Sequence, residues 1–315
     1  MDYRYLLRRA LQVGWQYKGL WLFGLIASLS LRIPLSGLEG LPPSLRGWVA
    51  ARIPTATTLL PTALYLLESL LNLALLALNS LGHAALVNQV SHAENGGLPS
   101  LRAGWHAGRQ RAKPTFLILL LLNLPVLVIT ALGVLPAQLL PRLLERALGP
   151  VPYPAGIILS TSVTMLCLLP ALALALLLTV PLRVLARLAV RACVLEGHTV
   201  RRSLARAWEL ARWNLGTIAL LWLILAAVTA GIVLTVSLPL GLLALVFVPL
   251  ISLSRATSWG WIALDGVAVL FWLGGMLITA TVETFFSAVW TLGYRQWAGL
   301  GRTGDEPWPT GLPGA

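Results

Sequence analysis

Five polar side chains share one face of an apolar segment, the stretch Leu59–Val87. At 100° per residue they fall within about 60° of one another, and the stripe is about 27 Å long, nearly the thickness of a bilayer's hydrocarbon core. A glutamate and a histidine among them can titrate. The stripe predicts one wall of a polar path or headgroup groove, or else a buried helix whose amides bond neighbouring helices. The five residues are Tyr65, Glu68, Asn72, Asn79 and His83.

The last apolar segment of the chain carries a similar polar face. Thr279, Glu283 and Ser287 are spaced at i, i+4 and i+8, so they line one side of a helix. Because a charged carboxylate is costly inside a membrane, Glu283 must be protonated or paired. His83 and Arg183 are its candidate partners. The pattern predicts either a mechanistic role for Glu283 or a structural ion pair or hydrogen bond.

A motif of Ser-Leu, Trp and Arg occurs twice, each time before an apolar segment. In it, Trp stands four positions after Leu, and Arg four positions after Trp. A weaker copy, Ala10-Leu11 with Trp15, precedes the first apolar segment. In a helix, Leu and Trp can sink into the acyl boundary while Arg reaches phosphate. We therefore predict three units, each an amphipathic cytoplasmic helix that feeds a transmembrane pair. The full copies are Ser100-Leu101 with Trp105 and Arg109, and Ser203-Leu204 with Trp208 and Arg212.

The fourth apolar segment contains two prolines, Pro170 and Pro181, and ends in arginines spaced four residues apart. The prolines should kink or break the helix unless neighbours satisfy the freed carbonyls. The arginine stripe predicts an anchoring face on lipid phosphates, with a substrate-anion site as the alternative. The predicted headgroup contacts are Trp105, Arg109, Trp208, Arg212, Arg183, Arg187 and Arg191.

The composition of the chain predicts the kind of fold that positions these residues. Of the 315 residues, 57% are hydrophobic and only 11% are charged, whereas a soluble domain needs about 25% charged residues. Apolar runs of membrane-spanning length therefore predict an all-α polytopic membrane bundle, a single domain over residues 1–300 with a disordered cytoplasmic tail over 301–315. The six predicted spans are Gly19–Ile33, Leu59–Val87, Thr115–Leu139, Gly156–Ala189, Thr217–Leu238 and Trp261–Trp290.

Basic residues predict the orientation of these spans. With the N-terminus inside, most of the 23 lysines and arginines fall in the inner connecting segments. Both termini are therefore expected in the cytoplasm. The apolar stretch Gly241–Leu253 contains Pro249 and is too short to cross alone, so it is interpreted as an outer loop or re-entrant piece, with a seventh span as the alternative.

These patterns resemble the multi-pass membrane domain attached to bacterial glycerophosphodiester phosphodiesterases, and its free-standing relatives. The resemblance rests on Trp15 and Trp21-Leu22-Phe23-Gly24, the two Ser-Leu-Trp-Arg motifs, and the closing Thr291-Leu292-Gly293-Tyr294-Arg295. It implies a six-helix membrane fold. The 315 residues contain no soluble extension that would hold the hydrolase, so phosphodiester chemistry is not expected of this chain.

No nucleotide-binding loop, zinc-protease motif, nucleophile elbow or paired-cysteine knuckle occurs in the sequence. We expect no catalytic residue, metal site or cofactor, and no nucleic-acid partner. The favoured hypothesis is a non-catalytic protein of the bacterial inner membrane that engages anionic lipid as a membrane organiser or partner subunit. A small-solute or lipid transporter using the polar faces of the second and last spans is the alternative, and an intramembrane enzyme the third.

Overall fold

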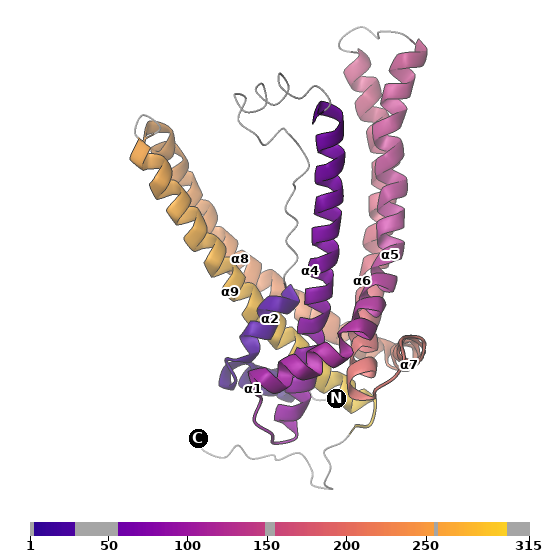
Figure 1. Ribbon diagram of the computed structural model, residues 1–315, viewed down its shortest axis with the longest axis vertical. Coiled ribbons are helices and arrows are strands. Elements are labelled where there is room, and N and C mark those ends of the chain that lie inside the picture. The colour runs from indigo at the N-terminus through magenta and orange to yellow at the C-terminus, as the bar shows by residue number, and fades with distance from the viewer. Residues whose placement is uncertain (1–2, 29–55, 149–154, 255–257, 301–315) are drawn as a thin grey trace. The chain divides into compact units, whose positions relative to one another are not determined.

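The computed structural model describes residues 3–28, 56–148, 155–254 and 258–300, and every element in these ranges is an α-helix (Figure 1). Two helices of 14 residues, α1 and α7, and the shorter α2 accompany five helices of 39 residues or more. In chain order they are α1 (Tyr3–Gln16), α2 (Leu20–Ser28), α4 (Ala56–Glu94), α5 (Leu101–Leu148), α6 (Ala155–Leu195), α7 (Val200–Trp213), α8 (Leu215–Ser254) and α9 (Ser258–Trp297).

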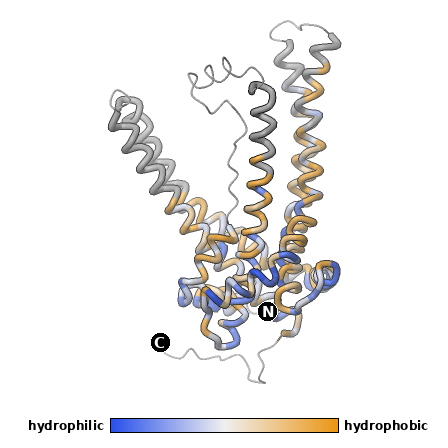
Figure 2. Tube along the Cα trace, viewed as in Figure 1, coloured by the Kyte–Doolittle hydropathy of each residue, from blue (hydrophilic) through white to orange (hydrophobic). Residues whose placement is uncertain are grey.

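Five of these helices are long and apolar enough to cross a membrane, which confirms the predicted all-α polytopic class. Figure 2 shows mostly hydrophobic residues along the described parts of α5 and α6 and many hydrophilic ones in α7. The predicted first span is described only over α2, and the rest of it lies outside the described residues, as does the tail over 301–315. The described stretches that are long and apolar enough are Leu70–Glu94, Leu101–Val134, Thr161–Leu195, Leu215–Val236 and Leu273–Trp297.

At three places where the sequence predicted or allowed an interruption, the structure has continuous helix. The prediction that Gly241–Leu253 forms a loop or re-entrant piece is wrong, because α8 runs unbroken to Ser254. The helix α6 likewise passes through Pro170 and Pro181, and the first full motif is the beginning of α5 rather than a separate helix. Apolar surroundings favour this continuity, since backbone groups there must bond within the helix, and one proline removes only one donor.

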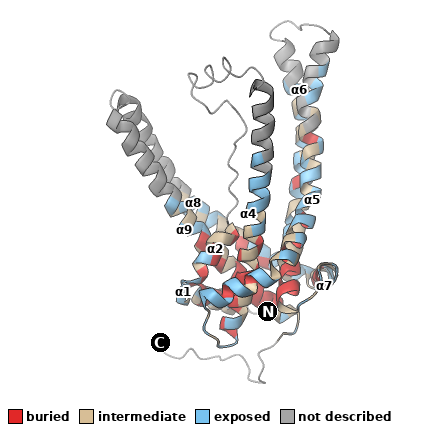
Figure 3. Ribbon diagram, viewed as in Figure 1, coloured by how far each residue is buried: buried red, intermediate tan, exposed pale blue. Residues whose placement is uncertain are grey.

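The described helices belong to two compact units. Unit 1 comprises residues 1–113 and 214–315, and unit 2 comprises residues 114–213. The beginning of α5 therefore belongs to unit 1, and the remainder of α5 to unit 2. Within unit 1, α2 packs against both α4 and α9, and buried residues gather around it (Figure 3). Within unit 2, α6 packs against α7.

Glycines allow the close approach of α2 to its two neighbours. A Cβ on Gly24 would run into the side chain of Thr284 and the backbone of Ala280 on α9. A Cβ on Gly82 of α4 would lie 2.5 Å from the backbone nitrogen of Ala27. Small residues of this kind let helix backbones pack closely where lipid removes the usual hydrophobic driving force.

One local arrangement recurs three times. The helices α4, α6 and α9 each end two residues before a glycine with positive φ, namely Gly96 (82°), Gly197 (71°) and Gly299 (68°). This is a common way to end a helix, because glycine adopts the left-handed conformation without a Cβ penalty. An amphipathic stretch packs against each: the start of α5 against α4, α7 against α6, and α1 against α9. The same arrangement therefore occurs at the ends of all three helices.

Candidate functional site

The residues of the polar stripe on α4 have different surroundings. Those toward the end of the helix contact neighbouring helices, and Asn72 does not lie among them. Asn79 donates a hydrogen bond from its amide to the Ala27 carbonyl at the end of α2. Asn72, two turns earlier, is exposed. The side chains of Tyr65 and Glu68 lie outside the described residues. The stripe therefore serves, in its inner part, to attach α2 to α4.

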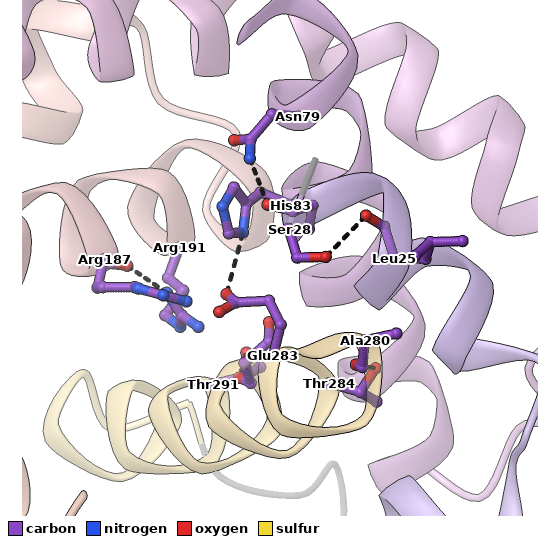
Figure 4. A network of polar contacts seen from close by, with 12 residues as sticks. Leu25, Ser28, Asn79, His83, Arg187, Arg191, Ala280, Glu283, Thr284 and Thr291 are labelled. Carbon is purple, nitrogen blue, oxygen red and sulfur yellow. Dashed lines mark hydrogen bonds and ion pairs between the residues drawn. The ribbon is translucent and has the colours of Figure 1, made fainter. Parts of the chain in front are cut away.

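His83 and Glu283 point toward each other from α4 and α9 (Figure 4). The distance from His83 Nδ1 to Glu283 Oε1 is 3.7 Å, and each side chain is 15% exposed. That separation is longer than a direct hydrogen bond, so the interaction is an electrostatic one between a carboxylate and an imidazole when the ring is protonated. The structure brings together the pair that the sequence predicted. Arg183, the other candidate partner, is an exposed residue of unit 2.

The other predicted members of the α9 face have local roles. Thr279 is exposed and donates to the Gly275 carbonyl, 2.7 Å away in its own helix. Ser287 is buried, and its carbonyl accepts a 2.7 Å hydrogen bond from the Thr291 hydroxyl. Of the predicted α9 face, Glu283 therefore interacts with the α4 stripe, through His83. Among the described contacts, the Thr279 side chain bonds only within its own helix.

Thr284 is a contact residue that sequence reasoning missed. Its buried hydroxyl lies 2.8 Å from the Ala280 carbonyl and 3.3 Å from the Leu20 carbonyl of α2. It sits one residue from Glu283, on the side of α9 that receives Gly24. A threonine beside a predicted polar face was the available signal, but the sequence does not show which helix faces it.

The last two turns of α4 collect a second set of polar contacts, also missed from the sequence. Arg9 of α1 reaches Glu94 with an Nε to Oε2 distance of 3.2 Å, and the Glu94 side chain is only 2% exposed. Arg295 of α9 donates to the Ser91 hydroxyl at 2.9 Å and to the Asn95 side-chain oxygen at 2.7 Å. These contacts join α1, α4 and α9. The one signal was an acidic residue just beyond an apolar run.

The three tryptophans of the repeated motif all face outward. Trp15 is 64% exposed, Trp105 is 47% exposed and Trp208 is 63% exposed. The residue just before each tryptophan is small and buried: Gly14 in α1, Gly104 in α5 and Ala207 in α7. In each copy a small residue is buried, and the neighbouring tryptophan is at the surface. This register was present in the sequence, but only the structure shows which side is covered.

The basic members of the motif are exposed as well. Arg109 and Arg212, four residues after their tryptophans, both lie at the surface. In the arginine stripe of α6, Arg183 is exposed and Arg187 is half-buried. Arg191 is 2% exposed and donates a 2.6 Å hydrogen bond to the Arg187 carbonyl. We do not assign Arg191 to the headgroup surface.

A charged cluster links α7 to the end of α6 in unit 2. Glu196 Oε2 lies 2.9 Å from His198 Nε2 and 3.7 Å from Arg206 Nε. Arg206 also pairs with Glu209, with an Nη1 to Oε2 distance of 3.0 Å. These contacts hold α7 on α6 and neutralise Arg206. No group of three or more His, Cys, Asp or Glu side chains among the described residues is arranged to hold a metal ion.

No protein-family model, curated protein or solved structure matches this chain.

Proposed function

We propose that this multi-pass membrane protein is a non-catalytic, lipid-interacting organiser of the bacterial inner membrane, with both termini in the cytoplasm. The observation that carries the proposal is the outward position of Trp15, Trp105 and Trp208 beside buried small residues. Exposed tryptophans next to cations are the residues expected at the boundary between acyl chains and anionic headgroups. The predicted resemblance to the membrane domain of bacterial phosphodiesterases is compatible with this role.

The inner part of the polar stripe also supports a structural bundle. Asn79 of the stripe donates a hydrogen bond to α2, and Glu94, which lies farther along α4 and outside the stripe, pairs with Arg9 of α1. Buried polar groups engaged between helices hold a membrane bundle together, with each interhelical hydrogen bond contributing about 0.6–2 kcal/mol. A pathway for solutes would need such groups to remain available to a substrate.

The test replaces the three tryptophans by alanine in the full chain, reconstituted in nanodiscs of mixed zwitterionic and anionic lipid. The variant is expected to lose most of the anionic-lipid enrichment that the unaltered protein shows by mass spectrometry of the nanodisc lipids. Trp222→Ala is the matched control, because Trp222 is an exposed tryptophan of α8 outside the motif. Equal enrichment around all three proteins would refute the proposal.

Transport is the second candidate, favoured by one observation. His83 and Glu283 form a partly exposed pair on the face of α4 that continues to the exposed Asn72. If a pathway reaches this pair, a hydrophobic carbodiimide should modify Glu283 in a pH-dependent manner, and Glu283→Gln should abolish the modification in a folded protein. In a purely structural bundle, Glu283→Gln should cost only about 1–2 kcal/mol of stability, and the carboxylate should not react at any pH that preserves folding.

A further inference from the structure

The beginning of α5 presents a continuous stripe of basic side chains. Arg102, His106, Arg109 and Lys113 follow one another at intervals of four, three and four residues, so they lie within about 60° on the helix surface, and all four are exposed. Trp105, 47% exposed, lies beside the stripe between Arg102 and Arg109. Cations therefore flank a tryptophan on both sides along the helix axis.

The opposite side of this stretch packs against α2 and α4, which belong to the same unit. A Cβ on Gly104 would lie 2.6 Å from the Phe23 ring, and one on Gly108 would lie 2.9 Å from the Leu81 carbonyl. The Ser100 amide donates a 3.0 Å hydrogen bond to the Gln89 side chain, and the Ser80 hydroxyl lies 3.3 Å from the Ala112 carbonyl. These attachments along the stretch fix which face is exposed, so the cations are preorganised rather than free to rotate with the helix.

The exposed stripe has no neighbouring carboxylate to neutralise it in the part of unit 1 that the structure describes. The two carboxylates described there are Glu94, which pairs with Arg9, and Glu283, which faces His83. Both are largely buried. Within the described part of unit 1, no carboxylate therefore pairs with Arg102, Arg109 or Lys113, and the complement of their positive charge is an anion.

The spacing of the basic side chains along α5 favours one kind of anion. Arg102 and Arg109 are two helical turns apart, about 10 Å along the axis, and Lys113 extends the second group by about 6 Å. A single phosphate can bind either Arg102 or the pair of Arg109 and Lys113. A headgroup with two phosphates can bind both groups at once, with Trp105 between them at the acyl boundary. We infer that the start of α5 binds an anionic lipid whose headgroup carries two phosphodiester groups. This inference rests on the proposed lipid-interacting function.

The same plan recurs in α7, but with a different charge balance. Trp208 also lies between exposed cations, Arg201 and Arg212. Its neighbour Glu209, however, is 57% exposed and engages Arg206. An exposed carboxylate beside the tryptophan repels phosphate, so α7 is the weaker site and supplies a control with the same residue types.

The experiment uses the full chain in nanodiscs that contain either a two-phosphate lipid or a one-phosphate anionic lipid at twice the mole fraction, so that total charge is equal. Lipid retained by the protein after transfer to mild detergent is counted by native mass spectrometry. We expect about tenfold preferential retention of the two-phosphate lipid. Arg102→Gln with Arg109→Gln should remove the preference, because each basic residue near the surface contributes to headgroup binding. Arg201→Gln with Arg212→Gln should leave the ratio of two-phosphate to one-phosphate lipid unchanged, whatever its effect on total lipid retention.

Equal retention of the two lipids at matched charge would overturn the inference, and so would an equal loss in both double variants. The four substituted arginines are exposed, so thermal melting of both variants should match that of the unaltered protein. If retention depends on the motif tryptophans but not on the number of phosphates, the proposed function stands and this inference fails. If neither anionic lipid is enriched, both fail.

Discussion

Arg9 and Glu94 form an ion pair with unequal partners. The Arg9 side chain is 31% exposed and can still reach water, whereas Glu94 is 2% exposed. Removing the arginine leaves a buried carboxylate without its charge partner, at a cost of about 3–5 kcal/mol. Replacing the carboxylate by an amide leaves an arginine that can be solvated. The two substitutions should therefore differ in their effect on stability.

Arg9→Gln is expected to lower the melting temperature of the detergent-solubilised protein more than Glu94→Gln, which should cost only about 1–2 kcal/mol. The double variant should be more stable than Arg9→Gln alone, because the buried charge has gone. Differential scanning fluorimetry on the three variants measures this order. Equal destabilisation by both single substitutions would mean that Glu94 is better solvated than its burial indicates.

At the scale of elements, the bundle of unit 1 depends on glycines that bring helices together. Gly104 receives the Phe23 ring of α2, and the Gln89 side chain lies 2.9 Å from the position of its missing Cβ. Gly104→Ala should therefore force the start of α5 away from α2 and α4, with a cost of about 1–3 kcal/mol from overpacking. The expected result is a lower melting temperature and weaker packing of the start of α5, the stretch that carries the exposed Trp105.

Gly231→Ala is the matched control for this substitution. Gly231 also lies inside a helix, α8, but nothing lies within 4 Å of its missing Cβ. Alanine is the better helix former by about 1 kcal/mol, so the control should be neutral or slightly stabilising. A Gly104→Ala protein as stable as the Gly231→Ala protein would show that the approach of Phe23 is not close enough to matter.

At the scale of the whole molecule, the topology is open to a direct test. The connections at Asn95 and His198 follow α4 and α6, each of which ends at the same kind of glycine turn, and both are expected on the cytoplasmic side with Thr303. Single cysteines there, in a background without Cys167 and Cys193, should resist a membrane-impermeant reagent in intact cells. Cysteines at Ser44, Pro150 and Thr257 should react. Labelling of the His198 and Thr257 positions from the same side would contradict an odd number of crossings between them.

The sequence by itself determined the helical membrane class, and it predicted where the spans lie. Those features follow from hydropathy over about 20 residues and from the 3.6-residue period, which are properties of contiguous chain. It also located the tryptophan motif and the polar stripe, and it named His83 as a candidate partner of Glu283. It failed at Gly241–Leu253, where proline and length indicated a loop, because local signals do not show that the apolar environment favours continuous helix.

Only the tertiary structure decided which polar groups are engaged and which side of each amphipathic helix is covered. Asn79 meets Ala27, Arg9 meets Glu94, and Gly104 meets Phe23 across separations of tens of residues in the chain. A helical wheel gives each residue's direction around its own axis but says nothing about the neighbour on that side. Packing between helices supplies that neighbour, since backbone approach at small residues determines which side chains come within reach.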